Sequence, residues 1–171
     1  MLRRLLSFDE ALLLACRRFH LPRRTKLMNA LTHLGDAKSW VLLALTLLAL
    51  GTPEAQLVAL RLGAGAGFAT VVAQLLKRVC RRARPTNTIV GFRALAENPD
   101  AFSFPSGHTA AAFGVAIALA GAGTGLGPLF AALAAGIGIS RVYLGAHYPL
   151  DVGIGALLGT CAGLLARVAV G

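Results

Sequence analysis

Two histidines and one aspartate lie in segments whose composition suits chemistry on a phosphate group. His147 and Asp151 are four residues apart at the expected start of a helix, so both side chains fall on one face. A carboxylate hydrogen-bonded to one imidazole nitrogen fixes the tautomer and leaves the other nitrogen free to attack. His108, which ends a Pro-Ser-Gly-His segment, is then available as a general acid.

Positive charge gathers in the same parts of the chain. Lys77, Arg84 and Arg141 supply fixed charge and many hydrogen-bond donors, which suits a phosphate group. Ser106 and Gly107 lie at an expected helix N-terminus, where free backbone N–H groups attract anions. Taken singly, a lysine or arginine at a membrane edge is more often an interfacial anchor. Taken together, these five residues predict a phosphate-binding site.

The composition indicates the scaffold that positions these residues. Of 171 residues, 56% are hydrophobic and 14% are charged, whereas about a quarter of a soluble domain is charged. A membrane-spanning helix needs about 20 mostly apolar residues. Five candidate spans approach or reach this length, at residues 37–50, 55–76, 106–120, 126–139 and 150–170, and the first can extend upstream to Leu27. The sequence therefore predicts an all-α integral membrane protein, with residues 1–171 as a single membrane-embedded domain.

Residues 7–20 differ from these spans. Their apolar side chains cluster on one helical face, and arginines lie on the opposite face. An amphipathic helix of this kind lies in the membrane interface, and a sixth crossing is the alternative. The predicted bundle thus has five to six transmembrane helices and an N-terminal interfacial helix.

The order of the spans brings the candidate residues to one membrane face. Lys77 ends the second predicted span and His108 begins the third. Two crossings later, Arg141 ends the fourth span and His147 precedes the fifth. Because successive spans alternate in direction, all four positions reach the same side. The long polar loop at residues 78–105, which includes Glu97 and Asp100, is also expected to be functional, and a Gly-rich turn is expected at residues 121–128.

The net charge of +10 raises the possibility of nucleic-acid binding. Seven of the 17 basic residues precede residue 27, and five more lie between Lys77 and Arg84, where they flank apolar runs. This distribution is typical of anchors at a membrane surface, and no nucleic-acid motif accompanies it. The three cysteines are scattered without zinc-ligand spacing, so neither a metal site nor a disulfide framework is expected.

Other residues have simpler structural interpretations. We expect structural roles for His20 and His33, a break of the first span at Asp36, headgroup-level positions for Trp40, Tyr143 and Tyr148, and a snorkelling side chain for Arg61. Small residues spaced four apart let membrane helices approach closely. We expect such packing faces at Gly63 and Gly67 and at Gly155, Gly159 and Gly163.

Three motifs together resemble the signature of type-2 phosphatidic acid phosphatases. They are Lys-x6-Arg-Pro at residues 77–85, Pro-Ser-Gly-His at residues 105–108 and Ser-Arg-x5-His-x3-Asp at residues 140–151, in which eleven positions agree. The resemblance implies a helical-bundle core and a reaction without metal or other cofactor. It implies His147 as the nucleophile, Asp151 as its support, and His108 as acid to the leaving group and then base for water. It implies that the phosphate is bound by Lys77, Arg84, Ser106, Gly107 and Arg141.

The reaction that this resemblance implies is removal of phosphate from a membrane lipid. The candidate substrates are phosphatidic acid, phosphatidylglycerol phosphate, polyprenyl phosphates or diphosphates, and a sugar phosphate on a polyprenyl carrier. A transporter or flippase that binds anionic lipid through the same basic cluster is the alternative, but it would not need the His147–Asp151 pair. Vanadate-dependent haloperoxidases share the phosphate-site motifs, but they are soluble.

The short chain and its high Gly and Ala content favour a bacterial cell membrane as the location. With five spans, the site lies on the same side as the N-terminus. Basic residues in short loops favour the cytoplasmic face, whereas resemblance to lipid phosphatases that work on the outer face favours the opposite one, and both stay open. The expected partners are membrane lipids and a lipid phosphate substrate, without nucleic acid; the sequence does not indicate an oligomeric state.

Overall fold

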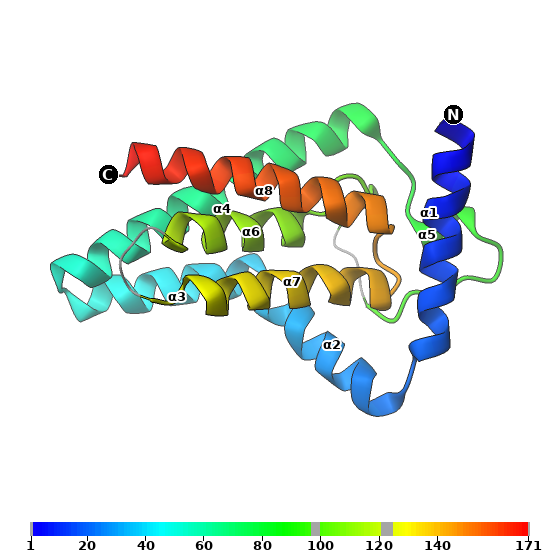
Figure 1. The fold of residues 1–171 in the computed structure, drawn as a ribbon, viewed down its shortest axis with the longest axis horizontal. Coiled ribbons are helices and arrows are strands. Elements are labelled where there is room, and N and C mark those ends of the chain that lie inside the picture. Colours follow the sequence, from blue (N-terminus) through cyan, green and yellow to red (C-terminus); the bar gives the residue numbers. More distant parts are fainter. Residues whose placement is uncertain (1, 97–99, 121–124, 171) are drawn as a thin grey trace.

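The computed structural model describes residues 2–96, 100–120 and 125–170, and these fold as a bundle of helices (Figure 1). The helices are α1 (Leu2–Cys16), the 3-10 turn η1 (Arg17–Phe19), α2 (Pro22–Leu34), α3 (Ala37–Leu50), α4 (Pro53–Cys80), the short α5 (Pro85–Thr88), α6 (Gly107–Ala120), α7 (Gly127–Tyr143) and α8 (Pro149–Ala169). The expected all-α class is confirmed. Glu97 and residues 121–124 of the expected Gly-rich turn lie outside the described residues.

All five predicted spans are helices, with shifted ends. By length and composition, α4 and α8 can each cross a membrane, and α2 and α3 can do so together although they are bent by 56°. α6 and α7 are apolar but shorter. The 14 residues of α6 extend about 21 Å, less than the hydrocarbon core of about 30 Å. A shorter helix suffices here because α6 packs against other helices over most of its surface.

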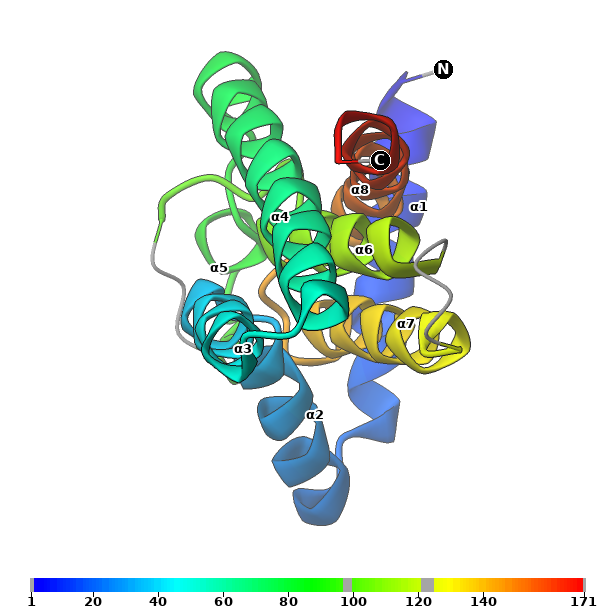
Figure 2. The ribbon, with the colours of Figure 1, turned by 90° about the vertical axis from the view of Figure 1, so that its left-hand side faces the viewer.

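α6 is the central helix, with α4, α7 and α8 around it (Figure 2). Its buried residues run from Thr109 to Leu119 and include five alanines. A helix that is apolar on all sides is expected to be enclosed by protein or lipid. The small side chains of α6 let its neighbours approach closely, and this fixes the end of α6 that carries His108.

Glycines of α8 face α6. A Cβ added at Gly155 would lie 2.7 Å from the carbonyl oxygen of Ser106, and one at Gly163 would lie 2.6 Å from that of Gly114. Real Cβ atoms do not come so close to an oxygen, so only glycine fits at these crossings. The predicted packing face of Gly155, Gly159 and Gly163 is confirmed.

The corresponding prediction for α4 is wrong. Gly63 and Gly67 are exposed, and a Cβ at either position would meet nothing within 4 Å. Gly65 makes the close approach instead, because a Cβ there would lie 2.5 Å from the carbonyl oxygen of Gly114. Residues two apart point to different sides of a helix, so the glycine spacing alone did not identify the buried side.

The first predicted span breaks at Gly35 and Asp36, as expected. Gly35 lies against α6 and α7, since a Cβ there would be 2.7 Å from Cγ2 of Ile137 and 3.4 Å from Cδ2 of His108. Beyond the break, the first turn of α3 buries Trp40 in the apolar core with residues of α4 and α6. The expectation that Trp40 serves as an interface anchor is therefore wrong, because this turn faces protein.

α1 runs crosswise to the long helices at one end of the bundle (Figure 1). Leu13 is buried against the bundle, whereas Phe8 and Leu12, and Phe19 of η1, expose apolar surface. A crosswise helix with apolar groups left outside suits the boundary between headgroups and acyl chains. The expected amphipathic helix is therefore present, although it starts at Leu2 and its apolar face is only partly covered by protein.

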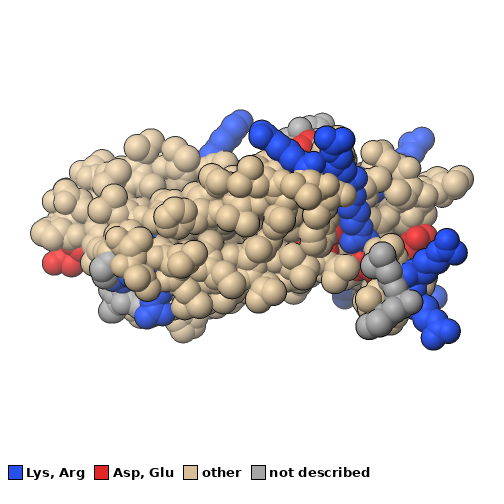
Figure 3. All heavy atoms as spheres, turned by 90° about the horizontal axis from the view of Figure 1, so that it is seen from above, with Lys and Arg blue, Asp and Glu red and all other residues tan. Residues whose placement is uncertain are grey.

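Lys and Arg side chains gather toward the end of the bundle where α1 lies, and a long uncharged surface covers much of the rest (Figure 3). Arg61 is an exception, because it is buried within α4. α4 begins at Pro53, so Arg61 lies about 12 Å along the helix, and protein covers its side chain. The expectation that Arg61 snorkels to the membrane surface is wrong.

Candidate active site

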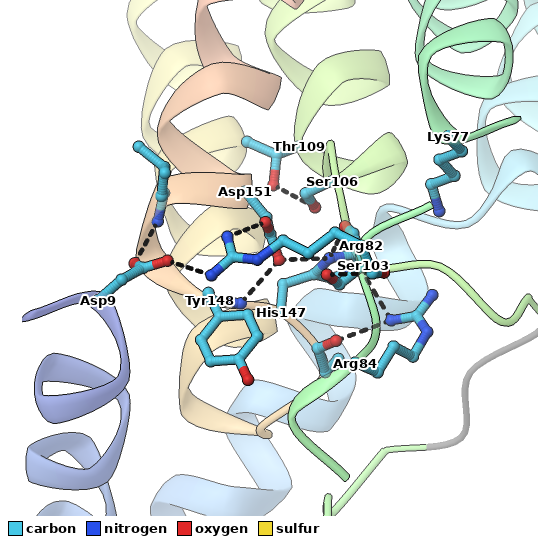
Figure 4. A network of polar contacts seen from close by, with 12 residues as sticks. Asp9, Lys77, Arg82, Arg84, Ser103, Ser106, Thr109, His147, Tyr148 and Asp151 are labelled. Carbon is cyan, nitrogen blue, oxygen red and sulfur yellow. Dashed lines mark hydrogen bonds and ion pairs between the residues drawn. The ribbon is translucent and has the colours of Figure 1, made fainter. Parts of the chain in front are cut away.

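His147 lies in the short connection between α7 and α8, which turns at Gly145 with a φ of 75°. The His147 side chain is 1% exposed, and its Nδ1 lies 2.7 Å from the carbonyl oxygen of Ser103 (Figure 4). A carbonyl only accepts hydrogen bonds, so Nδ1 carries the proton and Nε2 presents its lone pair. Nε2 lies 3.5 Å from Nη1 of Arg84. The imidazole is thus held in one tautomer with its free nitrogen toward a cation.

The surroundings of His147 also set its charge. Burial lowers its pKa to about 4; Asp151 opposes this shift, and the positive charges of Arg141 and Arg84 add to it. With this pKa, the imidazole is neutral at physiological pH. A neutral imidazole with a fixed lone pair is the form that can attack phosphorus.

Asp151 supports His147 less directly than the four-residue spacing predicts. Its Oδ2 lies 3.7 Å from Nδ1 of His147, beyond hydrogen-bond distance, and accepts the backbone N–H of Tyr148 at 3.0 Å. Its Oδ1 accepts a hydrogen bond from Arg82 at 2.6 Å. The prediction that Asp151 fixes the tautomer is therefore wrong, because the Ser103 carbonyl does so. Asp151 adds a negative charge near the imidazole and orders the first turn of α8.

Arg82 connects Asp151 to the N-terminal helix, a link that the motifs did not indicate. Its Nη2 donates to Oδ2 of Asp9 at 2.7 Å, and its guanidinium lies 4.0 Å from the centre of the Tyr148 ring (Figure 4). Asp9 also accepts the backbone N–H of Leu150 at 2.8 Å. α1 is thereby joined to the start of α8. The signal in the sequence was an acidic residue within a basic, apolar segment.

Lys77 and Arg84 converge on one carboxylate. Nζ of Lys77 donates to Oδ2 of Asp100 at 2.6 Å, and Nη2 of Arg84 donates to Oδ1. Arg84 also donates from Nη1 to the carbonyl oxygen of Ala146 at 2.7 Å, next to His147. Burial works against ionisation of Asp100, but Lys77 and Arg84 hold its pKa below the usual value. A negative charge is therefore already bound where two of the predicted phosphate-binding cations meet.

A cavity of about 360 Å³ is lined by His108 and Arg141. Nη1 of Arg141 donates to Oγ1 of Thr32 at 2.6 Å, which fixes the guanidinium. Nε2 of His108 lies 2.7 Å from Oδ1 of Asp36 and donates to it. The other residues of the lining are Asn29, Thr32, His33, Asp36, Leu95 and Ala96. The predicted acid and one predicted phosphate-binding cation therefore face the same space.

Ser106 and Gly107 lie where α6 begins, as predicted. The backbone N–H of Ser106 donates to the carbonyl oxygen of Asp151 at 3.0 Å, and its Oγ lies 2.9 Å from Oγ1 of Thr109. The expectation of a free N–H at Ser106 is therefore wrong. A Cβ at Gly107 would meet nothing within 4 Å, so this side of the backbone is open to a ligand.

The remaining histidine and tyrosine predictions concern structural roles. Nε2 of His20 donates to the carbonyl oxygen of Tyr143 at 2.7 Å, so its structural role is confirmed. His33 is an exposed neighbour of Asp36, with Nδ1 3.1 Å from Oδ2. Tyr143 and Tyr148 are both buried in protein contacts. The tyrosines therefore hold the connections around His147.

The geometry agrees with comparisons to known proteins. The PAP2 superfamily matches residues 58–171. Decaprenylphosphoryl-5-phosphoribose phosphatase of Mycobacterium tuberculosis (strain ATCC 25618 / H37Rv) is 38% identical over 138 residues, which are 80% of this chain and 75% of the relative. The chain belongs to the PAP2 superfamily. The resemblance predicted from the three motifs is confirmed, and with it the class of membrane phosphatase.

Two solved PAP2-type structures share the fold of this PAP2 protein. A transmembrane PAP2-type phosphatidylglycerolphosphate phosphatase from Bacillus subtilis aligns with a TM-score of 0.81 and 28% identity, over 97% of this chain and 86% of that one. LpxE of Aquifex aeolicus aligns with a TM-score of 0.76 and 27% identity, over 91% of this chain and 92% of that one. The helical arrangement is thus that of PAP2 membrane enzymes.

The ligand chemistry of this PAP2 site is cationic. Within residues 2–96, 100–120 and 125–170, no group of three or more His, Cys, Asp or Glu side chains is placed to hold a metal ion. Lys77, Arg84 and Arg141 instead bring three positive side chains to one end of the bundle. Such an arrangement suits the oxygens of a phosphate group.

Proposed function

We propose that this PAP2 protein hydrolyses a phosphate ester of a membrane lipid, with His147 as the nucleophile. The observation that carries the proposal is the state of His147, whose Nδ1 is bound by the Ser103 carbonyl while Nε2 faces Arg84. Nε2 forms a bond to phosphorus as the bond from phosphorus to the lipid oxygen breaks. His108 gives a proton to that oxygen, and the alcohol leaves.

The second half of the reaction regenerates the enzyme. His108, now neutral, takes a proton from water, and the resulting hydroxide attacks the phosphohistidine. The bond between Nε2 and phosphorus breaks, inorganic phosphate leaves, and His147 and the protonated His108 are restored. Splitting the displacement in this way replaces one difficult step by two easier ones.

Charge on the transferring phosphoryl group is stabilised by Lys77, Arg84 and Arg141, with Ser106 and Gly107 at the start of α6. Preorganised donors stabilise a transition state because they need no rearrangement as the charge develops. Asp100 now accepts from Lys77 and Arg84, so these donors turn at least partly from the carboxylate to the phosphate when substrate binds.

We infer that the leaving group is hydroxylated, as in a sugar phosphate on a polyprenyl carrier. Asn29, Thr32 and His33 line the cavity beside His108, and their polar groups suit hydroxyls better than acyl chains. The Mycobacterium tuberculosis relative is named for a phosphoribose on a decaprenyl carrier. Phosphatidic acid, phosphatidylglycerol phosphate and polyprenyl diphosphates are the other candidates.

We propose that residues 1–171 form one membrane-embedded phosphatase domain in the cell membrane. Its site opens on the same face as the N-terminus, because α1 lies at the end of the bundle where α8 begins (Figure 1), and Asp9 of α1 binds Arg82 and the backbone of Leu150 there. The crosswise α1 would then rest in the headgroup layer of that face. Labelling of single cysteines introduced near Arg3 and near Pro53, in intact cells, would test this arrangement.

The reaction is tested with the purified protein in detergent and a panel of candidate lipid phosphates, without added metal. Release of inorganic phosphate is measured for each lipid. The proposal expects turnover, fastest for the polyprenyl-linked sugar phosphate. Binding of these lipids without phosphate release would favour the alternative of a lipid transporter and would reject the catalytic proposal.

A further inference from the structure

We propose that Asp36 is a positioning residue for the proton donor His108, held beside it by the break between α2 and α3. This inference rests on the proposed function, because it assigns His108 the proton for the leaving group. Oδ1 of Asp36 accepts the hydrogen bond of His108 Nε2 at 2.7 Å. With Nε2 bound in this way, Nδ1 is the nitrogen left to deliver the proton to the leaving group.

The break itself is built around this contact. Asp36 stands at the N-cap of α3, where an aspartate ordinarily accepts a backbone N–H of the first turn. Its carboxylate makes no such cap, and its two oxygens bind His108 and His33 instead. A Cβ at Gly35 would lie 3.4 Å from Cδ2 of His108 and 2.7 Å from Cγ2 of Ile137, so a larger residue here would collide with Ile137. The local role of an N-cap is thus replaced by a contact 72 residues away in the sequence.

The electrostatic surroundings of His108 explain why a carboxylate is needed beside it. Burial of His108 disfavours its protonated imidazole, and the positive charges of Arg141 and Lys77 disfavour it further. A general acid must nevertheless hold a proton at the start of each turnover. Asp36 supplies the opposing negative charge and orients the ring. Asp36 and His108 both line the cavity, so the pair lies where the leaving group is expected.

The decisive variant is Asp36→Asn. Asparagine has nearly the same shape as aspartate and is equally suited to an N-cap position, so the change removes the negative charge without removing a cap, which the carboxylate does not form. Two probes are compared in the same detergent, dioctanoyl phosphatidic acid and p-nitrophenyl phosphate. The alkoxide of the lipid needs a proton to leave, whereas nitrophenolate does not. We expect kcat on the lipid to fall about 10- to 100-fold, as for other carboxylates that support a functional imidazole.

The same variant should retain most of kcat on p-nitrophenyl phosphate, and its inhibition constant for vanadate should stay unchanged. Equal loss on both substrates, or weaker vanadate inhibition, would overturn the proposal in favour of a structural or phosphate-binding role. Unchanged kcat on the lipid would overturn it as well. Wild-type protein that releases no phosphate from either probe or from any lipid phosphate of the panel would count against the proposed function instead.

Two further measurements guard against a folding defect. Asp36→Glu keeps the charge and should retain more activity on the lipid than Asp36→Asn does; the reverse order would contradict the proposal. In a His108→Ala background, Asp36→Asn should cause no further loss, because a residue that acts through His108 has nothing left to position. If Asp36→Asn lowered kcat in the His108→Ala background by the same factor as in the wild type, the proposal would be contradicted.

A matched control is available at the opposite end of the bundle. Thr52 is the N-cap of α4, and its Oγ1 accepts the N–H of Ala55 at 3.2 Å. Thr52→Ala removes a true cap far from the cavity and should leave kcat on both probes unchanged. If Thr52→Ala lowered kcat on the lipid but not on p-nitrophenyl phosphate, the effect of Asp36→Asn could be due to helix capping in general. The proposal that Asp36 acts by pairing with His108 would then be contradicted.

Discussion

The two histidines of the site are held in different ways. His147 is 1% exposed and is fixed by a backbone carbonyl, with cations on its free side. His108 is 19% exposed and lines a cavity, where a carboxylate is its partner. A backbone carbonyl cannot change its charge, whereas a carboxylate stabilises the protonated form of its neighbour. The protein thus fixes the lone pair of one imidazole and places beside the other a carboxylate that favours its protonated form against the effect of burial.

The difference follows from what each step requires. A nucleophile must present the same lone pair in every cycle, so a rigid and neutral environment is an advantage. An acid that later serves as a base must reach both the leaving group and water, so it needs an open side. Burial of about the same depth for both histidines would have impaired one of the two tasks.

The largest expected effect is that of His147→Ala. Neither a lipid phosphate nor an aryl phosphate can react without the nucleophile, so both should lose turnover alike, on the order of 10⁶-fold as for other lost nucleophiles. Samples quenched in alkali, where a phosphohistidine survives, should contain no phosphoenzyme after incubation with substrate labelled in its phosphate, whereas wild-type samples should contain it. Retention of a labelled intermediate in this variant would place the nucleophile elsewhere and remove the contrast between the two histidines.

His108→Ala should have the next largest effect, and one that depends on the substrate. Loss of a general acid should slow dioctanoyl phosphatidic acid by about 10²- to 10⁴-fold. p-Nitrophenyl phosphate should lose far less, since nitrophenolate leaves without a proton. Equal losses on both substrates would indicate that His108 binds phosphate or acts mainly as the base for water.

Asp151→Asn should have a smaller effect than either histidine change. The Ser103 carbonyl keeps the tautomer, so the change removes the negative charge 3.7 Å from Nδ1 and, because an amide has one acceptor oxygen, either the Arg82 or the Tyr148 hydrogen bond. A charge pair at this distance is worth at most about 4 kcal/mol, or roughly a 10³-fold change in rate. Turnover of both substrates should fall within this limit while the protein stays folded. Near-normal activity would mean that Asp151 only orders the start of α8.

Motifs in the sequence identified the residues that this comparison rests on, because each motif is local. His147, His108, Lys77, Arg84 and Arg141 were predicted from spacing, and the alternation of spans correctly brought them to one end of the bundle. The supporting roles of the carboxylates of Asp36 and Asp9 were not predicted. Asp36 meets His108 across 72 residues and Asp9 meets Arg82 across 73, so both contacts depend on how distant helices pack.

Helix positions were predictable from apolar length, but helix ends and burial were not. α7 continues to Tyr143, four residues past the predicted end, because Arg141 finds a hydrogen-bond partner in Thr32 and need not leave the helix. Trp40 and Arg61 were expected at the membrane surface and are buried. Their burial depends on the bend at Asp36 and on neighbouring helices, which a single stretch of sequence does not specify.

The smallest expected effect is that of metal removal. If His147 supplies the nucleophile, His108 the proton and three cationic side chains the charge stabilisation, each task that a catalytic metal performs is already assigned. Activity on both probes should therefore be unchanged after dialysis against EDTA. A soluble alkaline phosphatase, treated in parallel, should lose its activity and so verify the chelation. Loss of activity in this protein, restored by Mg²⁺ or Zn²⁺, would contradict the assignment. The two probes would then distinguish the role of the metal. Loss of activity on the lipid alone would implicate a metal in proton delivery at His108, whereas loss of activity on both probes would implicate it in phosphate binding. Either result would show that the two histidines and the three cationic side chains do not account for the whole reaction.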